Sequence, residues 1–114
     1  MIDDVRKCKR FDVEFDVDWT IENQGVSGKG KLLDVTTSGA CFRIAQPFSA
    51  PSALTFRMAV AELPAFPKRG RLRWFRRLPG RHPMFLCGVV FEDNDLSAWG
   101  RWLAQGQTPV RGER

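Results

Sequence analysis

The feature that most limits the fold of this chain is the segment FDVEFDVDW, residues 11–19. Every odd position in it is apolar and every even position is acidic. Successive side chains of a β-strand point to opposite faces, so a period of two is typical of a strand with one face in a core. The segment therefore predicts a strand whose apolar face is buried and whose acidic face lies in solvent.

The rest of the chain continues as short segments of similar length. Five further strands are predicted, at residues 28–34, 39–45, 52–60, 70–77 and 84–92. A short hairpin loop joins the first two of these, and the last, MFLCGVVFE, is apolar enough for a strand buried on both faces. In the strand GRLRWFRR we expect Leu72 and Trp74 to face the core and Arg71 and Arg73 to face solvent.

The pattern changes to a helical period near the C-terminus. Leu96, Trp99 and Leu103 recur at helical spacing with Trp102 beside them. Asn94 or Asp95 is available as the N-cap, and Gly106 as the C-terminal stop. Six strands followed by one helix predict an all-β fold, a small six-stranded antiparallel β-barrel whose C-terminal α-helix covers an open end.

Length and hydropathy predict one domain in a cytoplasmic protein. A chain of 114 residues has room for a single core. We expect residues 1–10 to form a flexible basic N-terminal arm, residues 11–105 the barrel with its helix, and residues 106–114 a disordered tail. No window approaches 18 consecutive apolar residues and the N-terminus has no apolar run, so neither membrane insertion nor secretion is predicted.

The cysteines and histidine argue against catalysis and metal binding. Three scattered cysteines and a single histidine, His82, supply neither a zinc cluster nor a histidine-based triad, so we expect no enzyme, no metal and no cofactor. Cys41 and Cys87 are predicted to be small buried side chains within strands. Cys8 lies between Lys7 and Lys9, where positive charge favours the reactive thiolate.

The charges are sorted by segment. The net charge is +5 and the pI about 9.6, which favours an anionic partner. Residues 12–22 carry acids without a base, whereas residues 68–81 carry seven basic residues without an acid, around Trp74 and Phe75. A nucleic-acid-binding barrel would use such a run. Strand alternation instead favours arginines that face solvent and pair with the acidic strand or its neighbours. One arginine near the hairpin loop could still contact a phosphate.

The hairpin loop DVTTSGA places Asp34, Thr36 and Gly39 at the spacing D-x-[ST]-x-x-G. A carboxylate can accept two parallel hydrogen bonds from the guanine edge that carries N1-H and the N2 amino group. The hydroxyl can add a third contact, and glycine permits a positive φ or a close approach of the backbone to a ligand. The same residues also suit a turn that bonds only to itself.

A second motif, R-x-x-x-R, is formed by Arg6 and Arg10 just before the first strand. With the later D-x-[ST]-x-x-G, the alternating strand, the RLRWF and GVVFED strands and the terminal helix, the chain resembles the PilZ family of cyclic di-GMP receptors over roughly residues 6 to 105. That resemblance implies a six-stranded barrel with such a helix. It also implies that Arg6 and Arg10 clasp the ligand through guanine and phosphate oxygens.

The resemblance further implies that Asp34, Thr36 and Gly39 hold the opposite side of cyclic di-GMP. The protein would then work by binding without chemistry, its N-terminal arm ordering around the dinucleotide and signalling to a protein partner. Thr36 stands where the family usually has serine, and its extra methyl predicts lower affinity. Two alternatives stay open: a PilZ-like adaptor that binds protein but no nucleotide, and a small nucleic-acid-binding barrel.

Overall fold

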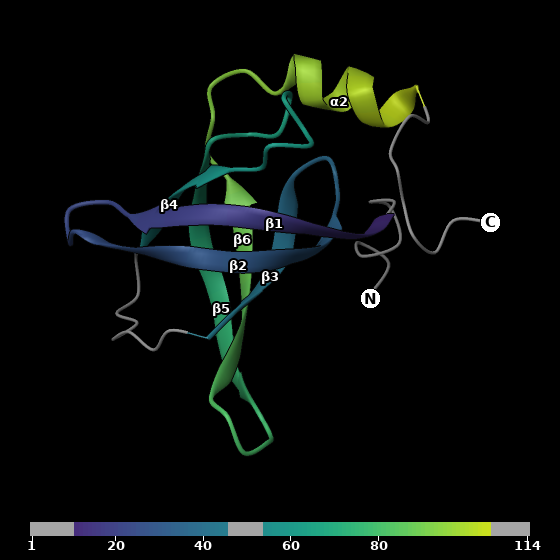
Figure 1. Cartoon of the computed structure of the whole chain (residues 1–114). Coiled ribbons are helices and arrows are strands. Elements are labelled where there is room, and N and C mark those ends of the chain that lie inside the picture. The colour runs from purple at the N-terminus through teal and green to yellow at the C-terminus, as the bar shows by residue number, and fades with distance from the viewer. Residues whose placement is uncertain (1–10, 46–53, 106–114) are drawn as a thin grey trace, which may run out of the picture.

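Six antiparallel strands close into a barrel (Figure 1). The computed structural model describes residues 11–45 and 54–105. The elements are β1 (Phe11–Ile21), β2 (Val26–Val35), β3 (Gly39–Ile44), β4 (Thr55–Ala59), β5 (Arg69–Leu78), β6 (Met84–Phe91) and α2 (Ser97–Ala104). Around the barrel the order is β1-β2-β3-β6-β5-β4, and β4 pairs with β1 to close it. The predicted six-stranded barrel with a C-terminal helix is confirmed.

The alternation in β1 has the effect predicted for it. Val13, Val17 and Trp19 are buried in the core. On the outer face, Lys31 and Lys29 of β2 donate to the carboxylates of Asp16 and Asp18, each at 2.7 Å. Exposed ion pairs contribute little to stability, so burial of the apolar face is what stabilises the strand.

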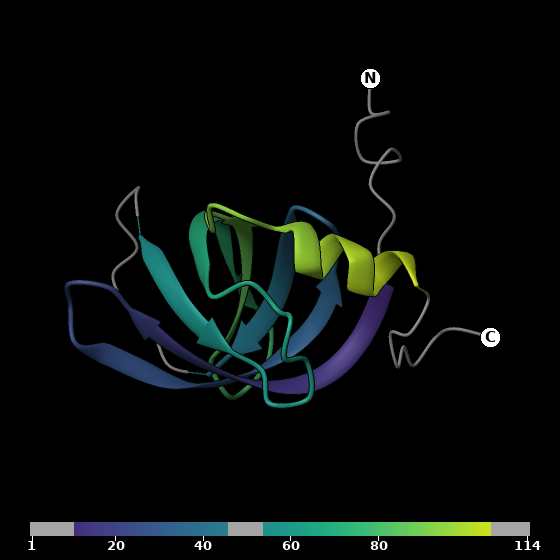
Figure 2. The same cartoon turned by 90° about the horizontal axis from the view of Figure 1, so that it is seen from above.

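One end of the barrel is covered by the loop after β4 and by α2, which Figure 2 shows from above. Trp99 of α2 is 1% exposed, and its ring meets that of Phe66 edge to face at 5.3 Å. Phe66 packs in the same way on Phe91. The helix begins at Ser97, and its N-cap is Leu96, so the prediction of Asn94 or Asp95 as the N-cap is wrong. Asp95 instead accepts a hydrogen bond from the backbone N–H of Ser97 at 2.9 Å. The predicted stop at Gly106 lies outside the described residues.

The sequence prediction for Trp74 is wrong. Trp74 is 46% exposed and lies on the outer face of the barrel. The pairing of β5 with β6 shifts between Leu72 and Trp74, because two residues of β5 span a single step of β6. Such a bulge reverses the alternation beyond it. Leu72 therefore faces inward as predicted, Trp74 faces outward, and Phe75 takes the inward position.

The two arginines at the start of β5, Arg69 and Arg71, are paired with acids, though not with those of β1. Arg69 donates to the Glu22 carboxylate from two nitrogens, at 2.9 and 3.1 Å, and Arg71 donates to Glu92 at 3.0 Å. The hydrogen bonds from Arg69 hold the pKa of Glu22 below its ordinary value. Because β4 separates β5 from β1, the acidic face of β1 contacts the lysines of β2 instead.

Asp93 stabilises the start of β5. Its two carboxylate oxygens accept hydrogen bonds from the backbone N–H groups of Lys68 and Arg69, both at 2.9 Å.

Within residues 11–45 and 54–105, no helix has the length and apolar surface that crossing a membrane requires.

Candidate functional site

Four residues from four neighbouring strands form one row across the outer face of the barrel. Asp34 of β2 is opposite Cys41 of β3, Cys41 is opposite Gly88 of β6, and Gly88 is opposite Trp74 of β5. Directly opposed residues in a sheet point to the same face. With three strand spacings between them, the Cα atoms of Asp34 and Trp74 are about 14 Å apart along the sheet. A carboxylate and an indole therefore face each other across a floor of small residues.

A hollow of about 670 Å³ lies over this row. The hairpin loop, with Thr36 and Gly39, forms one side, and Arg73, Trp74 and Arg76 of β5 form the other. This volume is in the range of small-molecule sites. The structure therefore brings the predicted motif of the loop together with part of the basic run, and it places two arginines near the loop where the sequence suggested one.

The hairpin loop is held by its own hydrogen bonds. The hydroxyl oxygen of Thr36 accepts from the backbone N–H groups of Ser38 and Gly39, at 3.1 and 3.0 Å. The backbone N–H of Thr36 donates to the Gly39 carbonyl at 2.9 Å. Thr36 therefore bonds within its own turn, as one of the two interpretations of this motif predicts, and its side chain shapes the loop beside the hollow.

Gly39 is required by the packing of the barrel itself. A Cβ at this position would lie 2.4 Å from the backbone carbonyl oxygen of Val89 in β6. This is too close for any residue that has a Cβ, so the position requires glycine. The constraint comes from a neighbouring strand, not from a positive φ. A loss of function in a Gly39 variant would therefore report on the fold as well as on the site.

The loop is also fastened to the terminal helix. The indole N–H of Trp99 donates to the backbone carbonyl of Thr36 at 2.9 Å. On the other side, the backbone N–H of Phe91 donates to the carbonyl of Ser38, also at 2.9 Å. A shift of the loop therefore acts directly on α2 and on the end of β6.

Trp74 is the site residue that the sequence analysis missed. A Cβ at Gly88 would lie 2.2 Å from the Trp74 ring, so the indole rests directly on the backbone of β6. The guanidinium carbon of Arg76 is 5.9 Å from the ring centroid, within the range of a cation–π contact. A glycine in the middle of an otherwise apolar strand was the available signal, because it marks a close approach by another group.

The two described cysteines differ. Cys87 is buried in the core, and burial raises the pKa of its thiol to about 12. Cys41 is half-buried on the outer face, in the floor of the hollow, so its prediction as a buried core residue is wrong. The prediction for the reactivity of Cys8 lies outside the described residues.

Arg6 and Arg10 lie outside the described residues. The described chain starts at Phe11, which pairs with Val35, while Asp12 pairs with Asp34. The entry into the barrel is thus next to the hairpin loop. Among residues 11–45 and 54–105, no group of three or more histidine, cysteine or acidic side chains is arranged to hold a metal ion.

The hollow offers a carboxylate at one end and two guanidinium groups with an aromatic face at the other. Arg73 and Arg76 form no ion pair within the described part of the chain. Guanidinium groups bind phosphate oxygens, a carboxylate binds the N–H edge of guanine, and an indole face stacks on a base. This combination suits an anionic purine nucleotide.

Comparisons with known proteins support the fold. The family model of the PilZ domain matches residues 4–105 of this chain. The structure of the Bacillus subtilis inhibitor of motility (MotI/DgrA) has a TM-score of 0.62 at 15% identity, covering 90% of this chain and 50% of that one. MrkH from K. pneumonia has a TM-score of 0.62 at 7% identity, covering 83% of this chain and 46% of that one. The chain thus spans about half the length of each. No curated protein matched significantly.

Proposed function

The chain belongs to the PilZ domain family, and on this premise we propose that it is a receptor for cyclic di-GMP that passes the signal to a protein partner. The observation that carries the proposal is the row from Asp34 to Trp74 beneath the hollow. It sets a carboxylate that can accept the N–H edge of guanine opposite an indole on which a base can stack, with arginines that can bind phosphates. The proposed reaction is reversible binding, without catalysis.

In the proposed complex, the carboxylate of Asp34 accepts hydrogen bonds from the N1-H and N2 amino groups of one guanine. Arg73 and Arg76 contact phosphate oxygens, and the exposed face of Trp74 stacks on a base. Thr36 and Gly39 hold the loop in the shape that presents Asp34. This arrangement assigns the strongest contacts, the charge-assisted hydrogen bonds, to the two ends of the hollow.

Arg6 and Arg10 are proposed to close over the ligand from the N-terminal side. The support from the described residues is the position of Phe11, which begins β1 opposite Val35, one residue past Asp34. The segment that carries both arginines is thereby attached to the barrel beside the loop. Their forked guanidinium groups suit bidentate contacts to phosphate or to guanine O6 and N7.

The signal is proposed to reach the partner through α2. The hydrogen bond from Trp99 to the Thr36 carbonyl joins the helix to the loop beside the ligand. A ligand changes the conformation only as far as it binds one state more tightly than another. Loop movement on binding would therefore shift the position of α2, and with it the surface available to a partner.

The direct test is calorimetric titration of cyclic di-GMP into the purified chain at 50 and 200 mM salt, with GMP as the control ligand. We expect a Kd of about 1 μM or lower at 50 mM salt, corresponding to about 8 kcal/mol of binding free energy. The stoichiometry distinguishes a single nucleotide from a stacked pair. Absence of heat together with absence of a thermal shift would favour the adaptor that binds protein alone.

Trp74 provides a test of the stacking surface. We expect Trp74→Ala to weaken cyclic di-GMP binding by about 5-fold to 150-fold, because stacking on an aromatic ring contributes about 1–3 kcal/mol per base. Trp74→Phe should keep most of the affinity. Gly88→Ala should also weaken binding, because the added methyl group displaces the indole from its seat.

Since Trp74 is exposed, its variants are expected to unfold at nearly the same temperature as the unmodified chain, and thermal unfolding provides that control. If Trp74→Ala binds cyclic di-GMP as tightly as the unmodified chain does, the proposed stacking of a base on Trp74 is wrong.

A further inference from the structure

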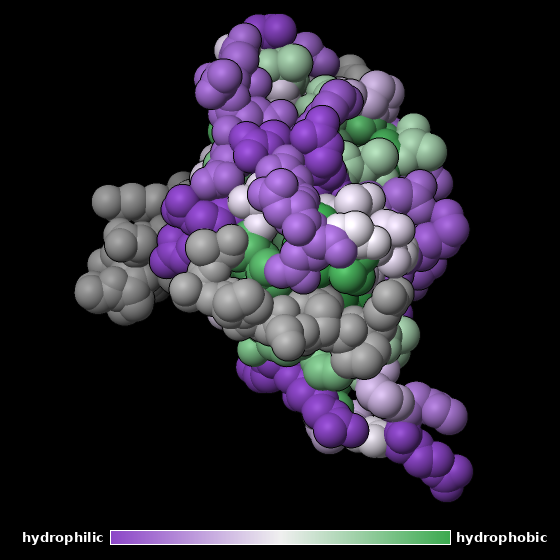
Figure 3. Space-filling model, turned by 90° about the vertical axis from the view of Figure 1, so that its left-hand side faces the viewer, coloured by the Kyte–Doolittle hydropathy of each residue, from purple (hydrophilic) through white to green (hydrophobic). Residues whose placement is uncertain are grey.

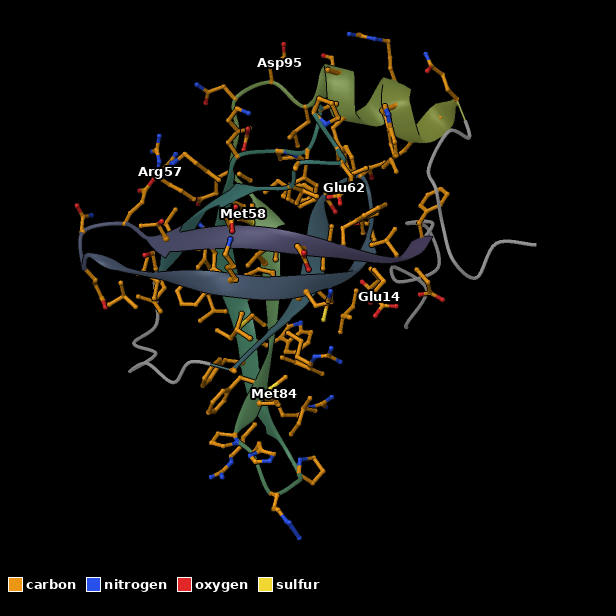
Figure 4. All side chains as sticks on the ribbon, viewed as in Figure 1. Glu14, Arg57, Met58, Glu62, Met84 and Asp95 are labelled. Atoms are coloured by element: carbon orange, nitrogen blue, oxygen red, sulfur yellow. The ribbon has the colours of Figure 1, made fainter. Side chains whose placement is uncertain are left out.

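The β5–β6 hairpin projects beyond the barrel as a two-stranded ribbon (Figure 1). The pairing of β3 with β6 ends at Phe85, whereas β5 and β6 continue to pair as far as Leu78 and Met84. β4 pairs with β5 only as far as Arg71. Figure 4 labels Met84 on this projecting part, far from α2. We call residues 73–84 the arm. Its part from Leu78 to Met84 lies beyond the end of β3, which pairs with β6 as far as Phe85, opposite Arg77.

The arm carries positive charge that no acid of the described residues neutralises. No acidic residue occurs between Arg69 and Phe91. Ion pairs form at the base of the hairpin, where Arg69 meets Glu22 and Arg71 meets Glu92. The four arginines of the arm are exposed and have no ion-pair partner among the described residues: Arg73, Arg76, Arg77 and Arg81. The strongly hydrophilic lower projection in Figure 3 corresponds to this hairpin.

The arginines are distributed around the ribbon. Arg76 is opposite Leu86 on the outer face, whereas Arg77 is opposite Phe85 on the other face, because neighbouring strand residues point in opposite directions. Arg81 lies in the turn at the tip. A flat acidic protein surface would contact one face and leave the arginines of the other face without a partner. A groove with phosphates on both walls would contact both faces.

We propose that the arm binds duplex DNA by inserting into the major groove. That groove is about 12 Å wide and 8.5 Å deep and admits a two-stranded β-ribbon. The part of the arm beyond the end of β3, from Leu78 to Arg81 in the turn, is at most about 10 Å long at about 3.3 Å per residue, enough to bring Arg81 to the floor of the groove. The major groove of duplex RNA is too narrow for side chains to enter, which favours DNA.

The DNA proposal does not depend on the proposed receptor function. Arg77 and Arg81 are outside the hollow, whereas Arg73 and Arg76 line it. Variants at the first two positions therefore test the arm without altering the nucleotide site. If both proposals hold, cyclic di-GMP competes with DNA, because its phosphates occupy two of the four arginines.

The experiment measures binding of the full chain to a fluorescein-labelled duplex DNA of 20 base pairs by anisotropy, from 50 to 200 mM salt. With about four phosphate contacts, the logarithm of the association constant should fall linearly with the logarithm of the salt concentration, with a slope of about −3.6. Arg77→Glu and Arg81→Glu should each weaken binding about tenfold and reduce the slope by about one. Both variants should bind cyclic di-GMP as the unmodified chain does.

The matched control is Arg101→Glu, which makes the same change in net charge on an exposed residue of α2, away from the arm. It should leave both the affinity and the slope unchanged. The proposal is overturned by an absence of DNA binding at 50 mM salt, or by equal weakening from Arg101→Glu and Arg77→Glu. It is also overturned if duplex RNA, polyglutamate or anionic lipid vesicles bind as tightly as DNA.

Discussion

A chain with Asp34→Ala is expected to bind cyclic di-GMP at least about tenfold more weakly than the unmodified chain. The carboxylate is proposed to accept two hydrogen bonds from guanine, and bonds to charged groups contribute about 1.5–3 kcal/mol each. The sign of the effect is informative. Cyclic di-GMP is an anion, so removal of a negative charge would strengthen binding if attraction between net charges alone governed the site. Calorimetry at two salt concentrations measures the change.

Asp12→Ala is the matched control for Asp34→Ala. Asp12 pairs with Asp34 across β1 and β2, is exposed on the same outer face, and does not line the hollow. It should leave the affinity unchanged or raise it slightly. Similar weakening by both substitutions would contradict a direct contact between Asp34 and guanine.

Arg6→Ala and Arg10→Ala belong to the same experiment. Each should weaken binding about tenfold or more, because each removes charge-assisted contacts proposed for phosphate or guanine. If Asp34→Ala weakens binding while both arginine variants retain full affinity, the N-terminal segment takes no part in the site. The hollow on the barrel would then account for binding on its own.

The second large effect is expected on stability. Trp99→Ala should lower the free energy of unfolding by about 3–5 kcal/mol, the usual result of truncating a buried aromatic side chain. Trp99 is 1% exposed, contacts Phe66 and Phe91, and stacks on Trp102 at 5.6 Å. Small domains have about 5–15 kcal/mol in total, so the variant should unfold at a much lower urea concentration.

Trp99→Phe separates packing from coupling. Phenylalanine keeps an aromatic ring against Phe66 but has no N–H to donate to the Thr36 carbonyl. We expect a smaller loss of stability than for Trp99→Ala and faster hydrogen exchange at the amides of Ser38 and Gly39. Unchanged exchange in the loop, with unchanged affinity for cyclic di-GMP, would contradict the proposed route from the loop to α2.

The local patterns were sufficient to predict the elements of this fold. The alternation over residues 11–19 required a half-buried strand, and the spacing of Trp99 and Leu103 required a helix with one buried face. These signals are readable because each depends only on which side of a single element faces the core. The hairpin loop with Asp34 and Thr36 was recognised for the same reason, since its motif lies within a few consecutive residues.

Trp74 could not be placed from its own strand. The bulge after Leu72 reverses the face of every later residue in β5, and nothing in the sequence RLRWF indicates where the pairing with β6 shifts. Its position depends on Gly88, which belongs to another strand. Likewise, the partners of Arg69 and Arg71 were set by strand order, since β4 separates β5 from the acidic strand β1.

The sequence alone thus determined the strands, the helix and the loop motif, because periodicity and turn chemistry are properties of neighbouring residues in the chain. Only the tertiary structure decided that Asp34 and Trp74 lie in one row with Cys41 and Gly88, and which arginines of β5 pair with acids among the described residues. The physical reason is that strand order and register arise from contacts between residues far apart in sequence. A one-residue shift in register changes the face to which each side chain points.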